Sequence, residues 1–307
     1  MGVTRYNLVQ ADQFLGSQAE ASPYGKIYYV DGTHGADDNS GLTPEEPKST
    51  IKGAIDATIA TRGDTIVVYP GTYTITAALA PVANTTIKAA HVVPHYPTVT
   101  IAGNIAELVT VDYSGCRFIG LEFKATGYTA VETVDIADGA DVNGCLFEDC
   151  VFTTSLGGAV GIVSNDATYK VTGLVVRRCL FNGETVSQIA IGALGAPYAK
   201  IEDNVFVLTT TTSTGIHLAD TATTQLTGHA TGLYCIRNND FIGLDSKSDV
   251  GITITGTENT LAAGMIRNNY FANCAAAAIT ADKLGINLVN NYVGDTGTGG
   301  TLVDAGN

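Results

Sequence analysis

The sequence predicts an all-β fold, a right-handed parallel β-helix solenoid with a capping helix at its N-terminal end. The first observation is a phrase that recurs roughly every thirty residues, with its clearest copies CIRNNDFIG at 235–243 and MIRNNYFAN at 265–273. The second is a series of short segments such as VGIVS and VGITIT, in which β-branched residues alternate with small ones. Such runs are typical of strands. Several strands per repeat, stacked in register, describe a solenoid.

Two other repeat architectures fit less well. Leucine-rich repeats would show a Leu-x-x-Leu-x-Leu pattern, and a propeller would show antiparallel hairpins with two-residue turns. In a parallel β-helix each coil supplies one strand to each of about three parallel sheets, with successive coils about 4.8 Å apart. That arrangement requires each coil to match the coil beneath it, which explains why the phrase recurs.

The N-terminal part of the chain has a different character. Residues 1–25 belong to no repeat, and we expect them to form an attachment arm; residues 26–80 are predicted to hold the cap and the first coil, and residues 81–307 the remaining coils. The open end of a β-helix exposes backbone and apolar side chains, so it requires a cap. A helix over Ser49–Ala60 is the expected lid. Its apolar positions are Ile51, Ala54, Ile55 and Ile59.

The recurring phrase defines columns of equivalent residues that should stack along the rod. The aromatic position and the aliphatic position five residues before it are expected to point inward. The aromatic column is Phe123, Phe152, Phe181, Phe206, Phe241, Phe271 and finally Val293. The aliphatic column is Phe118, Phe147, Val176, Ile201, Ile236, Ile266 and Leu288.

A third column, two residues before the aromatic one, is small and polar. It is made of Cys150, Cys179, Asn204, Asn239, Asn269 and Asn291. We predict that it lies at a bend between two sheets, where each Asn amide hydrogen-bonds its equivalents above and below. A buried Asn without such partners would cost about 1–3 kcal/mol. Parallel side chains are poorly aimed for a disulfide, so Cys150 and Cys179 are expected to be free thiols.

The charged residues of the phrase also fall into columns. The column four residues before the aromatic position is Glu148, Arg177, Glu202, Arg237 and Arg267. The next column is Asp149, Arg178, Asp203, Asn238, Asn268 and Asn290. Their signs alternate over the first rungs. These carboxylates could be acid–base catalysts, but we interpret the alternation as a ladder of cross-strand ion pairs, because like charges on adjacent rungs would repel.

The second series of strands offers the other candidate surface. Its expected inward residues are Ile136, Ile162, Ile191, Ile216, Ile252, Ile279 and Leu302. Its expected outward residues are Val163, Asn165, Gly192, His217, Ala219, Thr253, Thr255, Thr280 and Asp282. This face is small and rich in Thr, and we expect no carboxylate cluster and no Arg on it.

Two weaker sites are also predicted. Asp166 and Asp220 occupy matching positions after strands two rungs apart, so roughly 10 Å would separate them, near the upper limit for an inverting glycosidase pair. His217 could assist them. Solvated loop carboxylates explain the same residues.

The second of these sites is a Ca²⁺ site in the N-terminal loop. Its candidate ligands are Asp31, Asp37, Asp38 and Asn39, which offer hard oxygen donors at high density. Turn chemistry accounts for the same residue types. Apart from this Ca²⁺, no cofactor is expected.

Composition limits the function classes further. The net charge of −14 disfavours a nucleic-acid partner, because the phosphate backbone would be repelled. The sequence contains no apolar run of about 18 residues, so no membrane span is expected. Its first residues are polar and lack the apolar core of a signal peptide.

The N-terminal text YVDG, the Asp-x-x-x-Gly loop, the short helix and GDTIVVYPGTY resemble the start of pectin-lyase-like right-handed β-helix proteins. Asn-x-Phe rungs are typical of the same superfamily, and the resemblance covers about residues 26–307. It implies the fold but leaves function open, because the superfamily holds lyases, glycosidases, tailspikes and non-catalytic virion proteins. The Asp cluster and Arg base of pectate lyases find no match on the outward face predicted above.

The layout of a polar arm before a rigid rod resembles β-helix proteins of phage virions. That resemblance implies a non-enzymatic head decoration, spike or fibre component in the virion, a homotrimer whose partners include the capsid. The alternatives are a carbohydrate-active enzyme, such as a polysaccharide lyase, glycosidase or tailspike-like depolymerase, and a glycan-binding module that recognises surface glycans.

Overall fold

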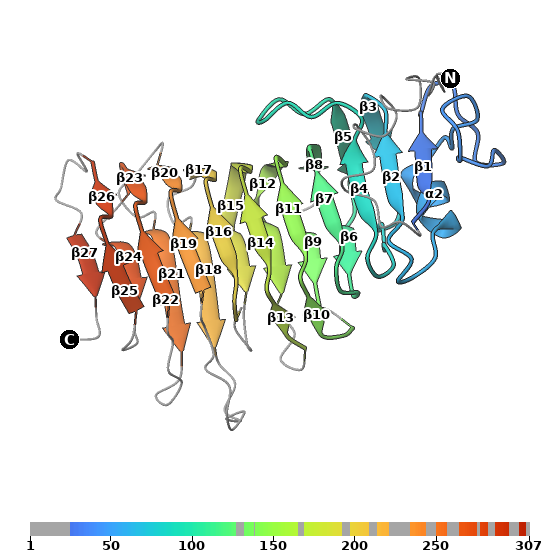
Figure 1. The fold of residues 1–307 in the computed structure, drawn as a ribbon. Coiled ribbons are helices and arrows are strands. Elements are labelled where there is room, and N and C mark those ends of the chain that lie inside the picture. The colour runs from blue at the N-terminus through green and yellow to red at the C-terminus, as the bar shows by residue number, and fades with distance from the viewer. Residues whose placement is uncertain are drawn as a thin grey trace, which may run out of the picture.

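The described part of the chain forms a straight solenoid, with the strands Ile27–Val30 and Thr301–Asp304 at opposite ends of the rod (Figure 1). The computed structural model describes residues 25–126, 132–137, 139–164, 169–191, 197–208, 214–220, 234–243, 250–256, 264–274, 277–281, 286–294 and 301–304. Every strand pair found among these residues is parallel, as the repeat predicts.

One flank of the rod is a sheet of ten described strands, called sheet A. It carries the aliphatic column and the first charged column, and the second charged column follows directly after its strands. Successive strands come from successive coils, so each pairs with a segment roughly thirty residues away. In spatial order they are β1 (Ile27–Val30), β2 (Thr65–Val68), β4 (Thr86–Ala89), β7 (Arg117–Ile119), β11 (Leu146–Glu148), β14 (Val175–Arg177), β16 (Lys200–Glu202), β19 (Tyr234–Arg237), β22 (Gly264–Arg267) and β25 (Ile286–Val289).

The aromatic column lies on a second sheet, called sheet B. The column begins on β8, and two earlier strands of the sheet precede it. The described strands, from the N-terminal end, are β3 (Gly71–Thr74), β5 (Val99–Gly103), β8 (Leu121–Ala125), β12 (Val151–Ser164), β15 (Leu180–Ile191), β17 (Val205–Leu208), β20 (Asp240–Gly243), β23 (Tyr270–Ala272) and β26 (Tyr292–Val293).

The second series of strands continues sheet B around a bend, because β12 and β15 run through that bend without interruption. These strands are β6 (Glu107–Val111), β9 (Glu132–Ile136), β18 (Thr214–Asp220), β21 (Val250–Gly256), β24 (Ala277–Ala281) and β27 (Thr301–Asp304). A short pair, β10 (Val142–Asn143) with β13 (Val171–Thr172), lies in the turns before sheet A.

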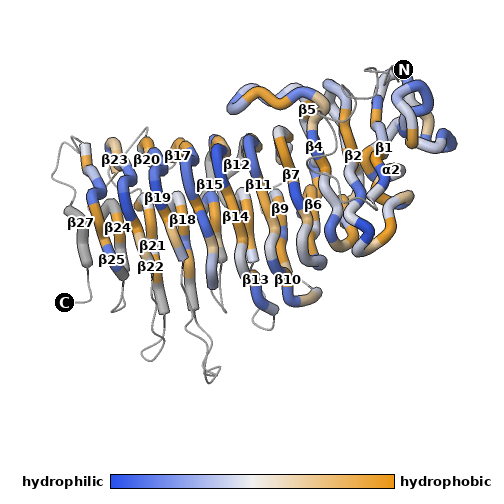
Figure 2. Tube along the Cα trace, in the orientation of Figure 1, coloured by the Kyte–Doolittle hydropathy of each residue, from blue (hydrophilic) through white to orange (hydrophobic). Residues whose placement is uncertain are grey.

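The interior is filled by the two stacked columns that the phrase defines. Hydropathy along the chain shows apolar positions recurring at the same height in each coil (Figure 2). The six Phe rings of the aromatic column are fully buried and stack face to face, with centroids 4.6–5.2 Å apart. Each ring buries a large apolar surface and keeps the next coil in register.

The capping helix is shorter than the sequence predicts. It is α2 (Ile51–Ala57), and Thr50 caps it by accepting a hydrogen bond from the Gly53 amide through its side chain. Ile51, Ala54 and Ile55 are buried, and the helix contacts β1 and β2. The prediction for Ile59 is wrong: it lies beyond the helix and its side chain is 57% exposed. The backbone is already extended at Thr58, which ends the apolar helical face.

The inward column of the second series also differs from the prediction. Ile162 pairs with Val134 and with Ile189, where the sequence predicted Ile136 and Ile191. A strand repeats its facing every two residues, so both alternatives satisfied the pattern. The register slips in the bend of β12 between Thr154 and Val160, and counting from the phrase therefore could not separate them.

Candidate functional site

The polar column forms a continuous chain of buried hydrogen bonds. The Nδ2 atoms of Asn204, Asn239 and Asn269 donate to the Oδ1 atoms of the next Asn in the column at 2.9–3.0 Å, ending at Asn291. Each Oδ1 also accepts from the backbone amide of the preceding Asn, and each Nδ2 reaches a carbonyl such as that of Ile201. The column therefore satisfies its own polar groups and leaves none of these amides for a ligand.

The cysteines at the start of this column are buried, and all six cysteines of the chain are free thiols. Cys179 donates its amide hydrogen to Asn204 Oδ1 at 2.9 Å, so the thiol rungs join the Asn ladder through the backbone. Burial raises the pKa of the Cys179 thiol, and the neighbouring Cys150 adds to the rise. A thiol kept protonated is a poor nucleophile.

The charged columns form ion pairs between adjacent rungs. Arg177 contacts Glu148 at 2.9 Å, and Arg237 contacts Glu202 at 2.7 Å. Arg178 binds Asp149 at 2.9 Å and also pairs with Glu148. Burial tends to raise the pKa of Glu148, but hydrogen bonds from the two guanidinium groups outweigh it and hold that pKa below its usual range. Arg thus holds the Glu148 carboxylate ionised, which makes it a poor general acid.

A carboxylate cluster that the sequence did not predict lies on the first two strands of the second series. Glu107 on β6 and Glu132 on β9 are partners in register, and Asp135 follows on the same strand. One oxygen of each carboxylate lies within 4.8 Å of the others. Glu107 also accepts a hydrogen bond from Thr110 at 3.2 Å, and Asp135 is only 7% exposed.

One signal in the sequence points to part of this cluster. Asp135 is outward by alternation, and Val163, which the sequence did place outward, is its partner in register. The segment ELVTV of β6 lacks the Gly-Ile pattern of the later rungs, so its membership of the series went unrecognised. Three carboxylates at this spacing could hold a hard divalent cation such as Ca²⁺.

The predicted acid–base residues do not join this cluster. His217 faces outward between Ala190 and Thr253, three rungs from Asp135, which is roughly 14 Å along the rod. Burial lowers the pKa of its imidazole. Asp220 ends β18, within the strand instead of after it, and its side chain lies outside the described residues. Asp166 lies outside them as well.

The carboxylates of Asp31 and Asp37 in the N-terminal loop accept hydrogen bonds from the loop's own backbone. Asp31 accepts from the amides of Thr33 and His34 and pairs with the His34 ring at 3.0 Å. Asp37 accepts from the amides of Ser49 and Thr50 and from the Thr50 hydroxyl.

The other two predicted Ca²⁺ ligands, Asp38 and Asn39, do not converge with Asp31 and Asp37 on a common point in the described loop. Asn39 donates to the Pro47 carbonyl at 2.8 Å. Asp38 belongs to the same turn, and the described carboxylates that gather within 4.8 Å are those of the Glu107 cluster. Ca²⁺ binding at this loop stays a prediction.

Aliphatic side chains lie in two adjacent rows on the outer face of sheet B, and Asp240 interrupts one of the rows between Val205 and Tyr270. These residues alternate with the buried Phe column, so they point away from the interior. They are only partly covered, except for Val151, which is 5% exposed. Beyond them Tyr270 and Tyr292 stack on each other with centroids 5.6 Å apart. We call this set the aliphatic stripe: Val151, Leu180, Val205, Val207, Ile242, Tyr270 and Tyr292.

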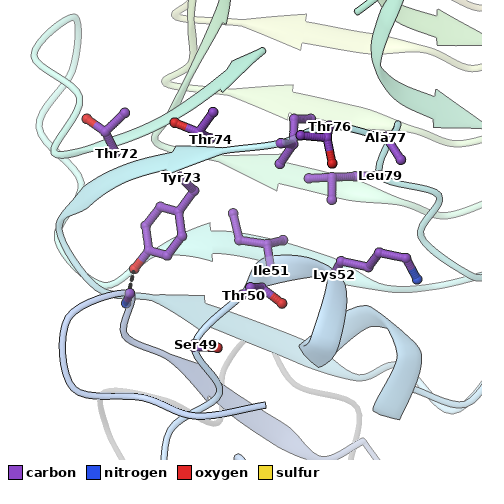
Figure 3. Close-up of a pocket in the computed structure, with 12 residues that line it drawn as sticks. Ser49, Thr50, Ile51, Lys52, Thr72, Tyr73, Thr74, Thr76, Ala77 and Leu79 are labelled. Atoms are coloured by element: carbon purple, nitrogen blue, oxygen red, sulfur yellow. Dashed lines mark hydrogen bonds between the residues drawn. The ribbon is translucent and has the colours of Figure 1, made fainter.

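A pocket of about 340 Å³ lies at the N-terminal end of the rod. It opens between β3 and the first turn of α2, with Tyr73 and Ile51 pointing into the space from opposite sides (Figure 3). The Tyr73 hydroxyl accepts from the Gly32 amide at 3.2 Å and donates to the Tyr69 carbonyl at 2.9 Å. Lys52 lies at the rim and pairs with Asp56 on its own helix at 2.7 Å.

Comparison with known proteins finds similarity in structure and none in sequence. No protein-family model matches the chain, and no curated protein matches its sequence. A PL6-family alginate lyase superposes on 95% of this chain and 42% of its own, with a TM-score of 0.61 and 11% identity. A pectin methylesterase from Aspergillus niger covers 94% of this chain and 91% of its own, with a TM-score of 0.50 and 13% identity.

Identity this low indicates a shared architecture and says nothing of shared chemistry. Across the described part of the chain, no helix has the length and apolar character needed to cross a membrane. Parallel strands stacked coil upon coil, together with these structural neighbours, establish the chain as a right-handed parallel β-helix protein of the pectin-lyase-like fold.

Proposed function

We propose that the protein is a non-enzymatic structural component of a phage virion, such as a head decoration, spike or fibre, and that it acts as a homotrimer. The observation that supports this proposal is the aliphatic stripe on the outer face of sheet B. The virion location and the capsid as partner rest on the resemblance of the sequence to β-helix virion proteins. Neither a nucleic acid nor a membrane is proposed as a partner.

The stripe has the geometry of a side-by-side contact between rods. It extends over six successive strands, from β12 to β26, which is roughly 24 Å along the axis. An aliphatic face flanked by polar residues marks an interaction surface. A flat stripe parallel to the long axis is matched by the same stripe on a parallel copy, and three copies around one axis would cover it from both sides.

The test is the mass of the full-length protein in solution. Mass photometry or sedimentation is expected to show trimers for the wild type, and monomers for the double variant Val205→Asp, Val207→Asp. Asn182→Asp is the matched control, because it adds one charge to an exposed position on the same face. A monomeric wild type, both alone and in purified phage particles that encode it, would sink the proposal.

A second function, that of a carbohydrate-active enzyme or glycan-binding module, is favoured by the Glu107–Glu132–Asp135 cluster. By their names, the two structural neighbours act on alginate and on pectin. In this proposal the cluster would bind Ca²⁺, and the cation would in turn bind a carboxylate of an acidic polysaccharide. Asp166, Asp220 and His217 stay candidate catalytic groups.

This alternative is tested by incubating the protein with alginate and pectin, with and without Ca²⁺, and by a glycan array. Ca²⁺ should raise the melting temperature of the wild type and not that of Glu132→Gln. Glu45→Gln removes an exposed carboxylate outside the cluster and should behave as the wild type. Cleavage that is lost in Asp166→Asn or Asp220→Asn would favour the enzyme over the structural protein.

A further inference from the structure

Sheet A begins one coil earlier than sheet B at the N-terminal end of the rod. The chain runs from β2 into β3, and β2 pairs with β4 as β3 pairs with β5. Sheet A has one more strand beneath β2, which is β1. After β1 the chain enters the loop over residues 31–50, so among the described residues no strand lies beneath β3.

The edge of β3 that faces this position carries backbone groups that pair with no other described strand. Gly71 and Ile75 donate their amides to Thr98 and Ala102 on the β5 side. Alternate residues of a strand point their amides to opposite sides, so the amides of Thr72 and Thr74 face the free edge. Both side chains are exposed. A free edge of this kind is a template for a further strand.

The 340 Å³ pocket occupies the same position. It lies directly beneath β3, with Thr72, Thr74 and Tyr73 on one side and Ile51 with Leu79 on the others (Figure 3). Tyr73, Ile51 and Leu79 are all buried, so the floor is apolar while the rim carries hydroxyl groups. At protein packing density the space would hold two bulky side chains. A strand added to β3 would place alternate apolar residues there.

We propose that the N-terminal arm of this chain supplies that strand, with residues 3–9 pairing in parallel with the free edge of β3. The segment reads VTRYNLV. Tyr6 and Leu8 share one face with Thr4, and Arg5 and Asn7 share the other with the flanking Val3 and Val9. Tyr6 and Leu8 fill the pocket, and Arg5 and Asn7 join the outward polar surface. The inference goes beyond the proposed function and does not depend on it.

The position of the arm favours it over a strand from another molecule. The arm joins the rod at Gly25, directly before β1, and β1 belongs to the coil that lacks a strand in sheet B. Residues 10–24 could span up to about 50 Å when extended, ample for a return to β3. A tethered strand also has an effective concentration of about millimolar order, which a free partner rarely reaches.

Hydrogen exchange of the full-length protein, measured by mass spectrometry, tests the pairing. Peptides over residues 3–10 and 71–76 are expected to exchange at least about tenfold more slowly than the unfolded chain. The variant Thr72→Pro, Thr74→Pro removes the two edge amides, and the arm should then exchange at the unfolded rate while Val99–Gly103 stays protected. The control Thr72→Val, Thr74→Val keeps both amides and should keep the arm protected.

The two proline substitutions could disrupt β3 itself, so a second variant changes the arm and leaves β3 intact. Leu8→Asp leaves the rod untouched and should abolish protection of the arm by placing a charge in the apolar pocket. Three outcomes would overturn the proposal: an arm that exchanges freely in the wild type, an arm equally protected in Leu8→Asp, and protection that falls on dilution. The last would assign the edge to another copy of the chain.

Discussion

At the scale of single residues, the bend before sheet B sets two requirements on adjacent positions. Asp149, Arg178, Asp203 and Asn238 have φ of 51–58°, as do the equivalent residues of the later rungs within a few degrees. Asn and Asp tolerate this left-handed conformation better than other residues with side chains, which explains their frequency in that column. The next position is buried and must satisfy its polar groups, and there Asn forms the ladder.

Replacing Asn239 should therefore be costly. Asn239→Leu removes the acceptor of the Asn204 side chain and the donor to the Ile201 carbonyl. Each buried polar group left unpaired costs about 1–3 kcal/mol, so the loss should be several kcal/mol. The control is Asn238→Gly, since glycine adopts the φ of 54° freely and should be near neutral. Thermal unfolding measures both, and equal melting temperatures for Asn239→Leu and the wild type would refute the ladder.

Asp240 is expected to make the free energy of unfolding depend on pH. It lies on the face of the aliphatic stripe, and burial raises the pKa of its carboxyl group. A carboxyl with a raised pKa binds its proton more tightly in the folded chain. Its stabilising contribution is therefore full below the unfolded pKa of about 3.9 and is lost as the pH rises through the folded pKa.

An asparagine at this position cannot ionise, so Asp240→Asn avoids the stability that the wild type loses when this carboxyl loses its proton. The variant should therefore be more stable than the wild type at pH 7, with a smaller difference at pH 3. Chemical denaturation at the two pH values measures it. Asp38→Asn, at an exposed loop position, serves as the control. A wild type that is the more stable of the two at pH 7 would contradict the raised pKa.

At the scale of elements, the cap depends on one network of hydrogen bonds between the loop and the helix. Asp37 receives two backbone amides and the Thr50 hydroxyl, and Thr50 in turn caps α2. On the other side of the helix, Asp64 is fully buried and binds Arg62 and the amides of Lys26 and Ile59. A seven-residue helix has little stability of its own, so these contacts hold it on the end of the rod.

Thr50→Ala should loosen this cap. Loss of an N-cap costs about 0.5–2 kcal/mol, and Asp37 loses one partner as well. Hydrogen exchange should quicken in Ile51–Ala57 and leave the coils beyond β8 unchanged. Thr50→Ser keeps the hydroxyl and should restore the wild-type rate. Uniformly faster exchange along the whole rod would show that the cap is not a local unit.

At the scale of the whole molecule, the rod is a one-dimensional stack in which each coil contacts its two neighbours. Interactions between coils therefore decide whether the rod unfolds as one unit. The Phe column is the strongest apolar link, because each interior ring stacks on one above and one below. The outer faces serve other roles: sheet A carries the ion pairs, and sheet B carries the aliphatic stripe.

A cavity in the middle of the Phe column should make the two parts of the rod unfold separately. Phe206→Ala removes the ring between Phe181 and Phe241 and should cost about 3–5 kcal/mol. We expect calorimetry to show a broader unfolding transition than in the wild type. Amide hydrogen exchange should show the coils from β20 onward losing protection first. Phe206→Leu keeps most of the volume and should cost less. A single sharp transition at the wild-type temperature would show that the ring is dispensable.

The sequence by itself determined the fold, the columns of the phrase and the presence of a cap. These follow from a repeat that every coil must obey, because a residue is matched to its equivalent in the next coil. The Phe stack, the Asn ladder and the pairs of Glu148 and Glu202 with Arg could thus be read before any coordinates. The short helix could be located, although its end at Ala57 could not.

Only the tertiary structure decided which residues of the second series share a row and what gathers on its outer face. The bend contains different numbers of residues in different coils, and a strand period of two permits more than one register. Glu107, Glu132 and Asp135 meet because separate coils place them side by side, a contact that no local pattern announces. The free edge of β3 likewise exists only because two sheets of one rod begin at different coils.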